Sequence, residues 1–281
     1  MRRIELTVTP DGRVPVPYSD GYSLYAALLA ALDDVDASVS ARVHDAPFGS
    51  LHTSGLLGTF GTTDREHHKL LLPDRQYEIA LGVVDPGDQD VFEALVTALV
   101  FDGDTLELTD GTISVDAFES RRVSREDLLA EAGEYDDPSL SVDFRSPTCI
   151  EERGAVTTMF PHRGAVFASL LGAWNRSLPD DADHLELDLT RETVEANVIE
   201  KPNPQSYDTH SVLVNRFEDD DGETRPEFRQ GFTAECVYEF KNATESVRNA
   251  VTTLALFGEF GGVGSAVARG CGAVSVEVAS K

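Results

Sequence analysis

The stretch from Phe257 to Gly272 carries the clearest chemical signal in this sequence. Its glycines are Gly258, Gly261, Gly262, Gly264, Gly270 and Gly272. Ordering such a segment costs conformational entropy, so a fold keeps it where the backbone needs positive φ or a close approach. Main-chain N–H groups without side chains around them can cradle a phosphate. The stretch therefore indicates an anionic ligand, and the alternative is a long connection between elements that needs flexible turns.

Histidine and cysteine residues define the other candidate chemistry. The seven histidines are candidates for proton transfer, because imidazole titrates near neutral pH. The three cysteines (Cys149, Cys236 and Cys271) are far apart and form no Cys-x-x-Cys pair, which indicates reduced thiols inside a cell and no structural zinc. His44, Asp45 and His52 lack a spacing typical of metal ligands. We therefore expect no metal and no other cofactor.

Composition limits what can be read from the total charge. The chain has 50 acidic and 23 basic residues, a formal net charge of −27, and its lysines are only Lys69, Lys201, Lys241 and Lys281. This balance is typical of proteins from salt-loving archaea, in which molar salt shortens the Debye length to about 3 Å. The negative net charge therefore does not exclude binding to nucleic acid, and the local placement of arginines matters instead. With no signal peptide and no apolar run of about 18 residues, we expect a soluble, cytoplasmic protein without a membrane partner.

The first half of the chain alternates strand and helix patterns. Apolar residues recur every second position at Ile4, Leu6 and Val8, which predicts a strand. The same reasoning predicts, in chain order, a helix over 22–32, a short strand over 41–44, a strand over 79–83, a helix over 88–101 and strand material over 106–118. The order is β-α-β-β-α-β.

The second half repeats that order after an acidic, breaker-containing segment over 132–138. The patterns predict a strand over 140–144, a helix over 166–174, strands over 196–200, 211–217 and 232–240, a helix over 244–257 and a strand over 274–278. We therefore predict an α+β protein of two tandem ferredoxin-like (βαββαβ, RRM-like) domains, residues 1–131 and 139–281.

On this predicted fold, several short motifs occur in a recognisable order. They are Val16-Pro17-Tyr18, Val43-His44-Asp45, Leu51-His52-Thr53-Ser54, Phe144-Arg145-Ser146-Pro147-Thr148, and Gly262-x-Gly264 followed by Gly270-x-Gly272. In this arrangement the chain resembles, over nearly its whole length, the CRISPR-associated Cas6 endoribonucleases, which belong to the RAMP superfamily of tandem ferredoxin-like RNA binders.

The resemblance implies a metal-independent cut within the CRISPR repeat of a precursor transcript, which produces guide RNAs. Members of the family often stay with the interference complex, so other subunits of a type I complex are candidate partners beside CRISPR repeat RNA. One alternative is a non-catalytic RAMP-type subunit that binds guide RNA. Another is a tandem ferredoxin-like protein that binds a small molecule or regulates metabolism.

In the implied reaction the 2′-hydroxyl of the RNA attacks the adjacent phosphate and leaves a 2′,3′-cyclic phosphate and a 5′-hydroxyl. The step needs a base, an acid and donors to the phosphate. His44 occupies the position that matches the catalytic histidine of the family. Leu29 and Ser50 stand where several members carry a tyrosine and a lysine. We therefore expect Ser50 or His52 to supply the missing proton donor.

The RNA-binding candidates are the loop glycines and the arginines near the motifs. N–H groups of Gly262, Gly264, Gly270 and Gly272 are expected to hold the phosphate. An arginine fork suits phosphate geometry better than lysine does. Arg121, Arg122 and Arg269 are the arginines that we expect to contact RNA.

Overall fold

Strand β1 (Arg2–Pro10) shows how the first sheet is built. Ile4, Leu6 and Val8 have no exposed surface, whereas the residues between them are half-buried. This period of two buries one face of the sheet and leaves the other face open. The computed structural model describes residues 1–46, 51–84, 88–101, 105–152, 156–179, 182–218 and 222–280.

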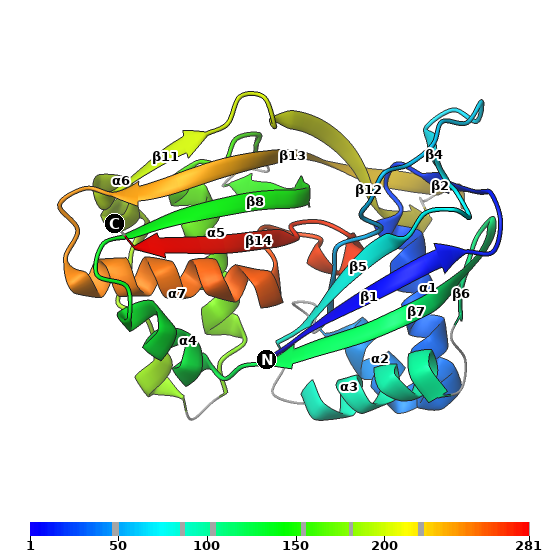
Figure 1. Cartoon of the computed structure of the whole chain (residues 1–281), viewed down its shortest axis with the longest axis horizontal. Coiled ribbons are helices and arrows are strands. Elements are labelled where there is room, and N and C mark those ends of the chain that lie inside the picture. Colours follow the sequence, from blue (N-terminus) through cyan, green and yellow to red (C-terminus); the bar gives the residue numbers. More distant parts are fainter. Residues whose placement is uncertain are drawn as a thin grey trace.

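The first sheet is antiparallel and is covered by helices on one face only. Its strand order is β3 (Leu51–Thr53), β5 (Tyr77–Val83), β1, β7 (Gly111–Arg122) and β6 (Thr105–Leu108). The covering helices are α1 (Gly21–Val35), α2 (Ala37–Asp45) and α3 (Asp88–Val96), which continues into the π-helical turn η1 (Thr97–Phe101) (Figure 1). Strands β2 (Val14–Pro17) and β4 (His68–Leu71) form a separate two-stranded sheet.

Helix α2 corrects the sequence prediction, which expected a strand over 41–44. The side chain of Asp36 accepts hydrogen bonds from the N–H groups of Ser38 and Val39 and so caps the helix. Val39 and Val43, four residues apart, are buried against the rest of the domain. The cap and this spacing favour a helix over the brief alternation that suggested a strand.

The second sheet repeats the topology of the first. Its order is β11 (Val198–Pro202), β13 (Thr224–Phe240), β8 (Pro138–Thr148) and β14 (Val274–Ser280), which corresponds to the order β3, β5, β1 and β7. Helices α5 (Arg163–Arg176) and α7 (Glu245–Gly261) pack on one face of it, and the short helices α6 (Arg191–Asn197) and η2 (Asp183–Leu185) join the same core. The prediction of two tandem ferredoxin-like domains is confirmed.

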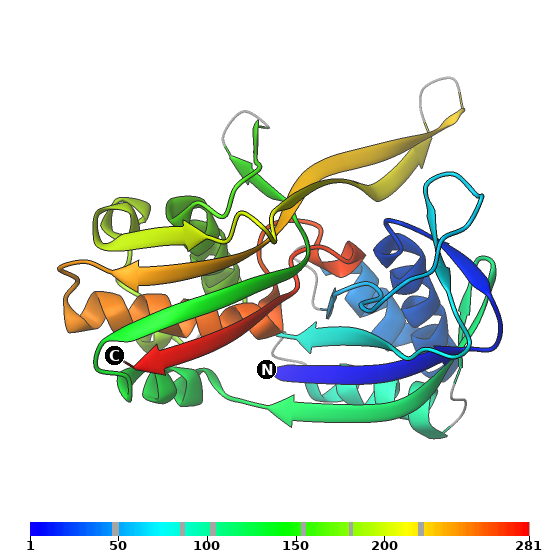
Figure 2. The same cartoon turned by 45° about the horizontal axis from the view of Figure 1, so that its top comes forward.

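A long hairpin extends from the second domain toward the first. Strand β12 (Asp208–Glu218) pairs with β13 beyond the main sheet, and the pair projects past the seam between the domains (Figure 2). The hydroxyl of Ser19 donates to the carbonyl of Ser211 on this hairpin. A smaller hairpin of β9 (Ile150–Glu152) and β10 (Val156–Thr158) lies on the same side.

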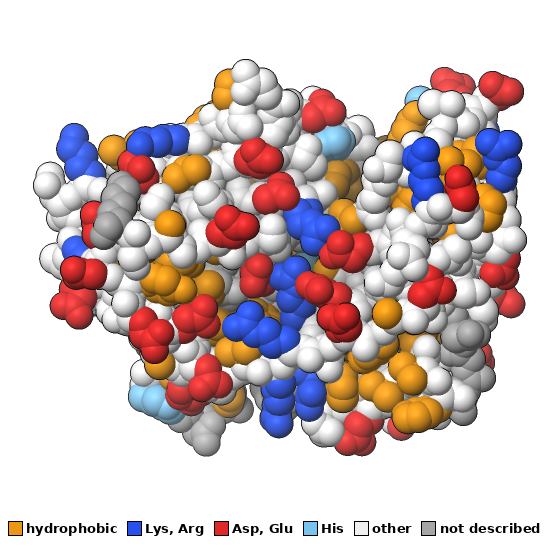
Figure 3. Space-filling model, in the orientation of Figure 1, with side chains coloured by type: hydrophobic (Ala, Val, Ile, Leu, Met, Phe, Trp, Pro, Cys, Tyr) orange, Lys and Arg blue, Asp and Glu red, His pale blue; other side chains and the backbone are white. Residues whose placement is uncertain are grey.

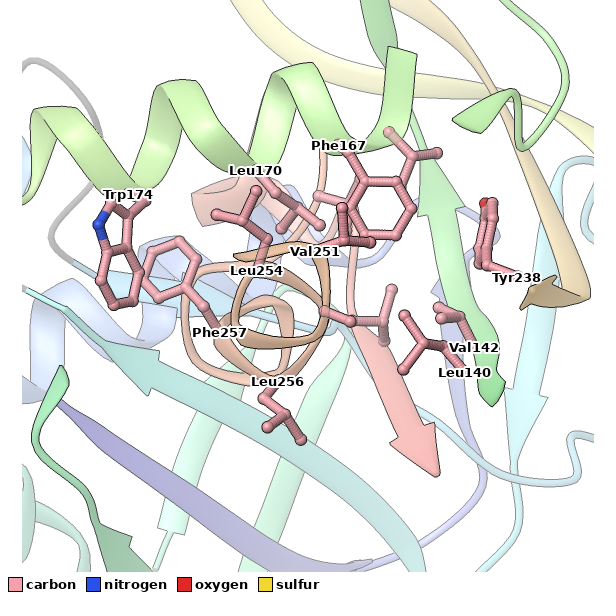
Figure 4. Packing of buried hydrophobic residues seen from close by; sticks show 14 of the residues in the cluster. Leu140, Val142, Phe167, Leu170, Trp174, Tyr238, Val251, Leu254, Leu256 and Phe257 are labelled. Carbon is pink, nitrogen blue, oxygen red and sulfur yellow. The ribbon is translucent and has the colours of Figure 1, made fainter. Parts of the chain in front are cut away.

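Edge-to-face aromatic pairs hold the core of the second domain (Figure 4). Trp174 on α5 meets Phe257 on α7 with ring centroids 5.3 Å apart, and Phe167 meets Tyr238 at 5.2 Å. Each such pair contributes about 1 kcal/mol beyond the area that it buries. This core fixes α7, whose C-terminal end leads into the glycine-rich stretch.

Helix α4 (Arg125–Gly133) packs with the second domain. Its buried residues Leu128 and Ala132 belong to the core that α5 and α7 form, and Met1 and Val123 also join that core. By packing, therefore, the second domain begins near residue 124, before the predicted first-domain end at 131. Among the described residues, no helix is both long and apolar enough to cross a membrane.

Candidate functional site

His44 lies in the last turn of α2 and is exposed. The neighbouring Val43 is 1% exposed and fixes this turn against the core of the first domain. Because successive helix residues point in different directions, burial of Val43 turns His44 toward solvent. The imidazole can therefore reach a substrate without any rearrangement of the helix.

Arg269 brings the glycine-rich stretch close to this turn. It belongs to the 3-10 turn η3 (Val267–Arg269), and its guanidinium lies 4.1 Å from the ring centroid of Tyr25 and 5.4 Å from that of Tyr22, both on α1. The hydroxyl of Tyr25 points at the carbonyl oxygen of Val43 at 3.5 Å. Two contacts therefore connect Arg269 with the residue before His44. We call His44, Tyr25 and Arg269 the helix-side site.

Sequence reasoning included Tyr25 in the predicted helix over 22–32 but did not name it as a site residue. It does lie in the core, with 3% exposure, but its ring also supports Arg269. Burial raises the pKa of the Tyr25 phenol, and the charge of Arg269 opposes that shift. The phenol therefore stays protonated at neutral pH. The spacing of Tyr22 and Tyr25 on one helix face was the available signal.

The loop glycines allow close packing. At Gly21, the first residue of α1, a Cβ would lie 2.3 Å from the carbonyl oxygen of Arg269, and at Gly270 (φ 83°) it would lie 2.7 Å from the Cα of Gly21. Both distances are shorter than real Cβ contacts allow. The two backbones touch here, which seats η3 on the start of α1.

The predicted phosphate cradle is not available at three of the four glycines. The N–H of Gly262 donates to the carbonyl of Gly258, that of Gly264 to the hydroxyl of Ser169, and that of Gly272 to the carbonyl of Pro147. These donors are used inside the protein. The glycine-rich stretch contributes the guanidinium of Arg269 to the surface instead.

His52 lies beneath the same stretch and is 3% exposed. Its ring packs against Gly82 and Gly262, and both ring nitrogens are buried. Burial, together with the charge of Arg3, lowers the pKa of His52 to about 4. The imidazole is therefore neutral at pH 7 and shielded from substrate, which argues against the role of proton donor. Ser50 lies outside the described residues.

Arg121 and Arg122 do not act as a pair. In the β1–β7 register Arg121 is opposite Arg3 and Arg122 is opposite Arg2, so their side chains leave opposite faces of the sheet. Arg121 lies 3.7 Å from the carboxylate of Glu131 and is 57% exposed. Arg122 lines a separate hollow near the N-terminus. The two therefore cannot grip one phosphate together.

A groove crosses the open face of the sheets between the domains. Figure 3 shows basic side chains in a band at this seam, bordered by acidic ones. The described residues that line the groove include Arg3, Glu5, Glu78, Glu119, Arg121, Arg145 and Glu259. We call it the sheet groove. It lies on the face opposite the helix layer that carries His44.

The arginines of the sheet groove are held by carboxylates. Arg145 donates two hydrogen bonds to Glu78 across the domain seam, at 2.8 and 2.9 Å. Arg3 pairs with Glu5 at 2.9 Å and with Glu259 at 3.1 Å. Among the described residues, no group of three or more His, Cys, Asp or Glu side chains is arranged to hold a metal ion.

Comparison with known proteins finds a family model that matches part of the chain and solved structures that share its fold. The model of the CRISPR-associated endoribonuclease Cas6 family matches residues 142–274. A solved Cas6 product complex is 19% identical, with a TM-score of 0.67 over 98% of both chains. Thermus thermophilus Cas6 is 16% identical, with a TM-score of 0.60 over 98% of both chains.

A third similar structure is described as an RAMP protein that binds different RNA substrates. It is 13% identical, with a TM-score of 0.62 over 99% of this chain and all of that one. No curated protein sequence matches the chain. At these identities the structural likeness establishes a shared fold over the whole length, and the family match covers most of the second domain. Residues 142–274 thus resemble the CRISPR-associated Cas6 endoribonuclease family, and the whole chain shares the fold of solved Cas6 and RAMP proteins.

Proposed function

We propose that this protein cleaves CRISPR repeat RNA in precursor transcripts to give guide RNAs. The 2′-hydroxyl beside the scissile phosphate attacks that phosphate, and the products are a 2′,3′-cyclic phosphate and a 5′-hydroxyl. No metal takes part. The observation that carries the proposal is the helix-side site. There Arg269, which has no carboxylate partner among the described residues, is linked through Tyr25 to Val43, the residue before the exposed His44.

In this proposal His44 moves the proton, as the base for the 2′-hydroxyl or the acid for the leaving 5′-oxygen. Arg269 stabilises the charge that develops on the phosphate, and a guanidinium can do so through two parallel hydrogen bonds. Tyr25 positions Arg269 through its ring. Ser50 remains the candidate for the second proton-transfer group. His52 is assigned a packing role under η3.

The test uses the full chain, CRISPR repeat RNA and EDTA, with a second RNA that carries a 2′-deoxy sugar at the cut position. We expect cleavage of the first RNA and none of the second, because only the first carries the nucleophile. Loss of cleavage in EDTA would contradict the metal-independent step. Cleavage of the deoxy RNA would contradict 2′-hydroxyl attack.

His44→Ala separates the proposed function from its alternatives. We expect the cleavage rate to fall about 10²- to 10⁴-fold, the usual worth of a positioned acid or base, while RNA binding is kept. The control is His184→Ala, which removes another exposed histidine and should cleave at the parental rate. Binding without cleavage by the parental protein would favour a non-catalytic guide-RNA subunit. Absence of both would favour a small-molecule binder.

A further inference from the structure

Two of the three cysteines meet beneath the glycine-rich stretch. Cys149 follows β8, and Cys271 lies between Gly270 and Gly272. Their sulfurs are 3.9 Å apart although 122 positions separate them in the chain, and both side chains are fully buried. The proposed reaction uses neither thiol.

The surroundings leave the two sulfurs facing each other. They share a small apolar cluster with Val212 and Val214 of the long hairpin. Gly231 also adjoins the pair, because a Cβ there would lie 2.8 Å from the sulfur of Cys149. No larger side chain separates the two thiols.

Backbone hydrogen bonds hold the two segments together on both sides of the pair. The carbonyl of Cys149 accepts from the N–H of Ser265 at 2.7 Å and from its hydroxyl at 3.0 Å. The N–H of Gly272 donates to the carbonyl of Pro147 at 3.0 Å. The chain segments that carry the cysteines are therefore already aligned.

The electrostatics favour a reactive sulfur at Cys149. Hydrogen bonding to Cys271 lowers the pKa of Cys149; burial opposes this shift, and the positive charge of Arg229 adds to it. The same hydrogen bond, together with burial, raises the pKa of Cys271. The thiolate is the species that attacks a disulfide. Cys236 differs, because burial raises its pKa to about 11.

We propose that Cys149 and Cys271 form a redox modification site, at which a reversible disulfide ties the glycine-rich stretch to the end of β8. The Cys149 thiolate attacks a low-molecular-weight disulfide, which forms a mixed disulfide and releases one thiolate. Cys271 then loses its proton, its sulfur attacks the Cys149 sulfur, and the second thiolate is released. The two cysteines lose two protons and two electrons, and the electrons reduce the oxidant. A bond requires the sulfurs to approach by about 2 Å.

The bond would act on the segment that presents Arg269. Cys271 is two residues beyond Arg269, and its backbone adjoins the ring of His52. A disulfide would fix this segment in one arrangement. The consequence for RNA cleavage rests on the proposed function: we expect the oxidised protein to cleave more slowly than the reduced one, with recovery after reduction.

The test incubates the folded full-length protein with excess oxidised glutathione. We expect titratable thiols to fall from three to one, with a mass loss of about 2 Da for the two hydrogens and a crosslinked Cys149–Cys271 peptide. The melting temperature should rise on the order of 5 °C, because the bond closes a long loop in the unfolded chain. Dithiothreitol should reverse every change.

Cysteine variants make the result specific. Cys149→Ser and Cys271→Ser should each form no internal disulfide, whereas Cys236→Ser should form it as the parent does. The proposal is overturned if the folded parent keeps three thiols, or if a disulfide persists in Cys149→Ser or Cys271→Ser. Disulfide formation by a protein that cleaves no RNA in either state would refute the proposed function and leave the redox site standing.

Discussion

The helix-side site and the sheet groove both present arginine, but they hold it differently. Arg269 rests on the ring of Tyr25 and, among the described residues, has no carboxylate partner. Arg145 and Arg3 in the sheet groove are bound to carboxylates at 2.8 to 3.1 Å. The contrast does not arise from burial of Arg145, because its side chain is 25% exposed.

The difference shows what makes an arginine side chain available to a phosphate in a chain with a net charge of −27. A phosphate that approaches Arg145 must displace Glu78, so one charge-assisted pair replaces another and the net gain is small. An aromatic ring supports a guanidinium without neutralising it. Of these two regions, we therefore expect the helix-side site to bind a phosphate more favourably.

Among the variants that test this comparison of the two regions, displacement of η3 from α1 should give the largest effect. In Gly21→Ala the new Cβ would overlap the carbonyl of Arg269 and the Cα of Gly270, both backbone atoms. The turn must move away from α1 and carry Arg269 off the Tyr25 ring. We expect the cleavage rate to fall about 10- to 100-fold, because misplacement by about 1 Å has this cost in catalysis. Single-turnover kinetics at saturating RNA would measure it.

The matched control is Gly12→Ala, since nothing lies within 4 Å of a Cβ at Gly12. It should cleave at the parental rate. Equal activity of Gly21→Ala and the parent would show that the seat of η3 on α1 is not needed. The helix-side site would then lose its distinction from the sheet groove.

Acid pH should lower the stability of the fold through His52, which packs beneath the glycine-rich stretch. Its pKa is about 4 in the folded protein and 6.5 when unperturbed. Between these values the unfolded chain binds more protons, so stability is complete above about pH 6.5 and falls as the pH drops toward 4. The expected loss is roughly 3 kcal/mol. Urea unfolding at a series of pH values would measure it.

His52→Leu removes the titrating ring, and its stability should depend less on pH between 6.5 and 4 than that of the parent. His184→Ala, which removes an exposed histidine, should keep the parental pH dependence. Identical stability profiles against pH for His52→Leu and the parent would mean that the buried imidazole does not cause the loss of stability in acid.

The fold could be predicted because local patterns carry it. Alternation in β1 and in Phe232–Phe240, and the helix periods between such strands, were enough to give the βαββαβ order twice. The strand predicted over 41–44 was wrong, because an alternation of four residues is weaker evidence for a strand than the cap at Asp36 is for a helix. The predicted end of the first domain at 131 differs from the packing, because α4 packs on α7. This contact joins residues far apart in the chain, and the local pattern does not reveal it.

The site could be predicted only in part, because much of it depends on contacts across the domain seam. The glycine-rich stretch was located, but its use for close packing on Gly21 depends on another domain. Burial of His52 depends on Gly262 in the same way. The separation of Arg121 from Arg122 was readable from strand period once residues 106–118 were extended to 122. The Cys149–Cys271 contact had no sequence signal.

The smallest expected effect tests the sheet groove. Arg145 lowers the pKa of Glu78 by donating hydrogen bonds to it, so Glu78→Gln should weaken this pair and leave the guanidinium free for phosphate. Glu78 is 38% exposed, and solvent screening limits the loss of stability to about 1 kcal/mol. We expect RNA affinity at low salt to rise about two- to fivefold, with the cleavage rate at saturating RNA unchanged.

Glu119→Gln is the control for charge alone. Glu119 lines the same groove and is exposed, and among the described residues it has no arginine partner, so the variant removes one negative charge without releasing a cation. A rise in affinity in Glu78→Gln but not in Glu119→Gln would show that pairing suppresses phosphate binding in the groove. Equal rises in RNA affinity in the two variants would mean that the overall negative charge of the groove, and not the pairing of Arg145, limits phosphate binding there. A lower cleavage rate in Glu78→Gln would mean that the groove and the helix-side site act as one surface.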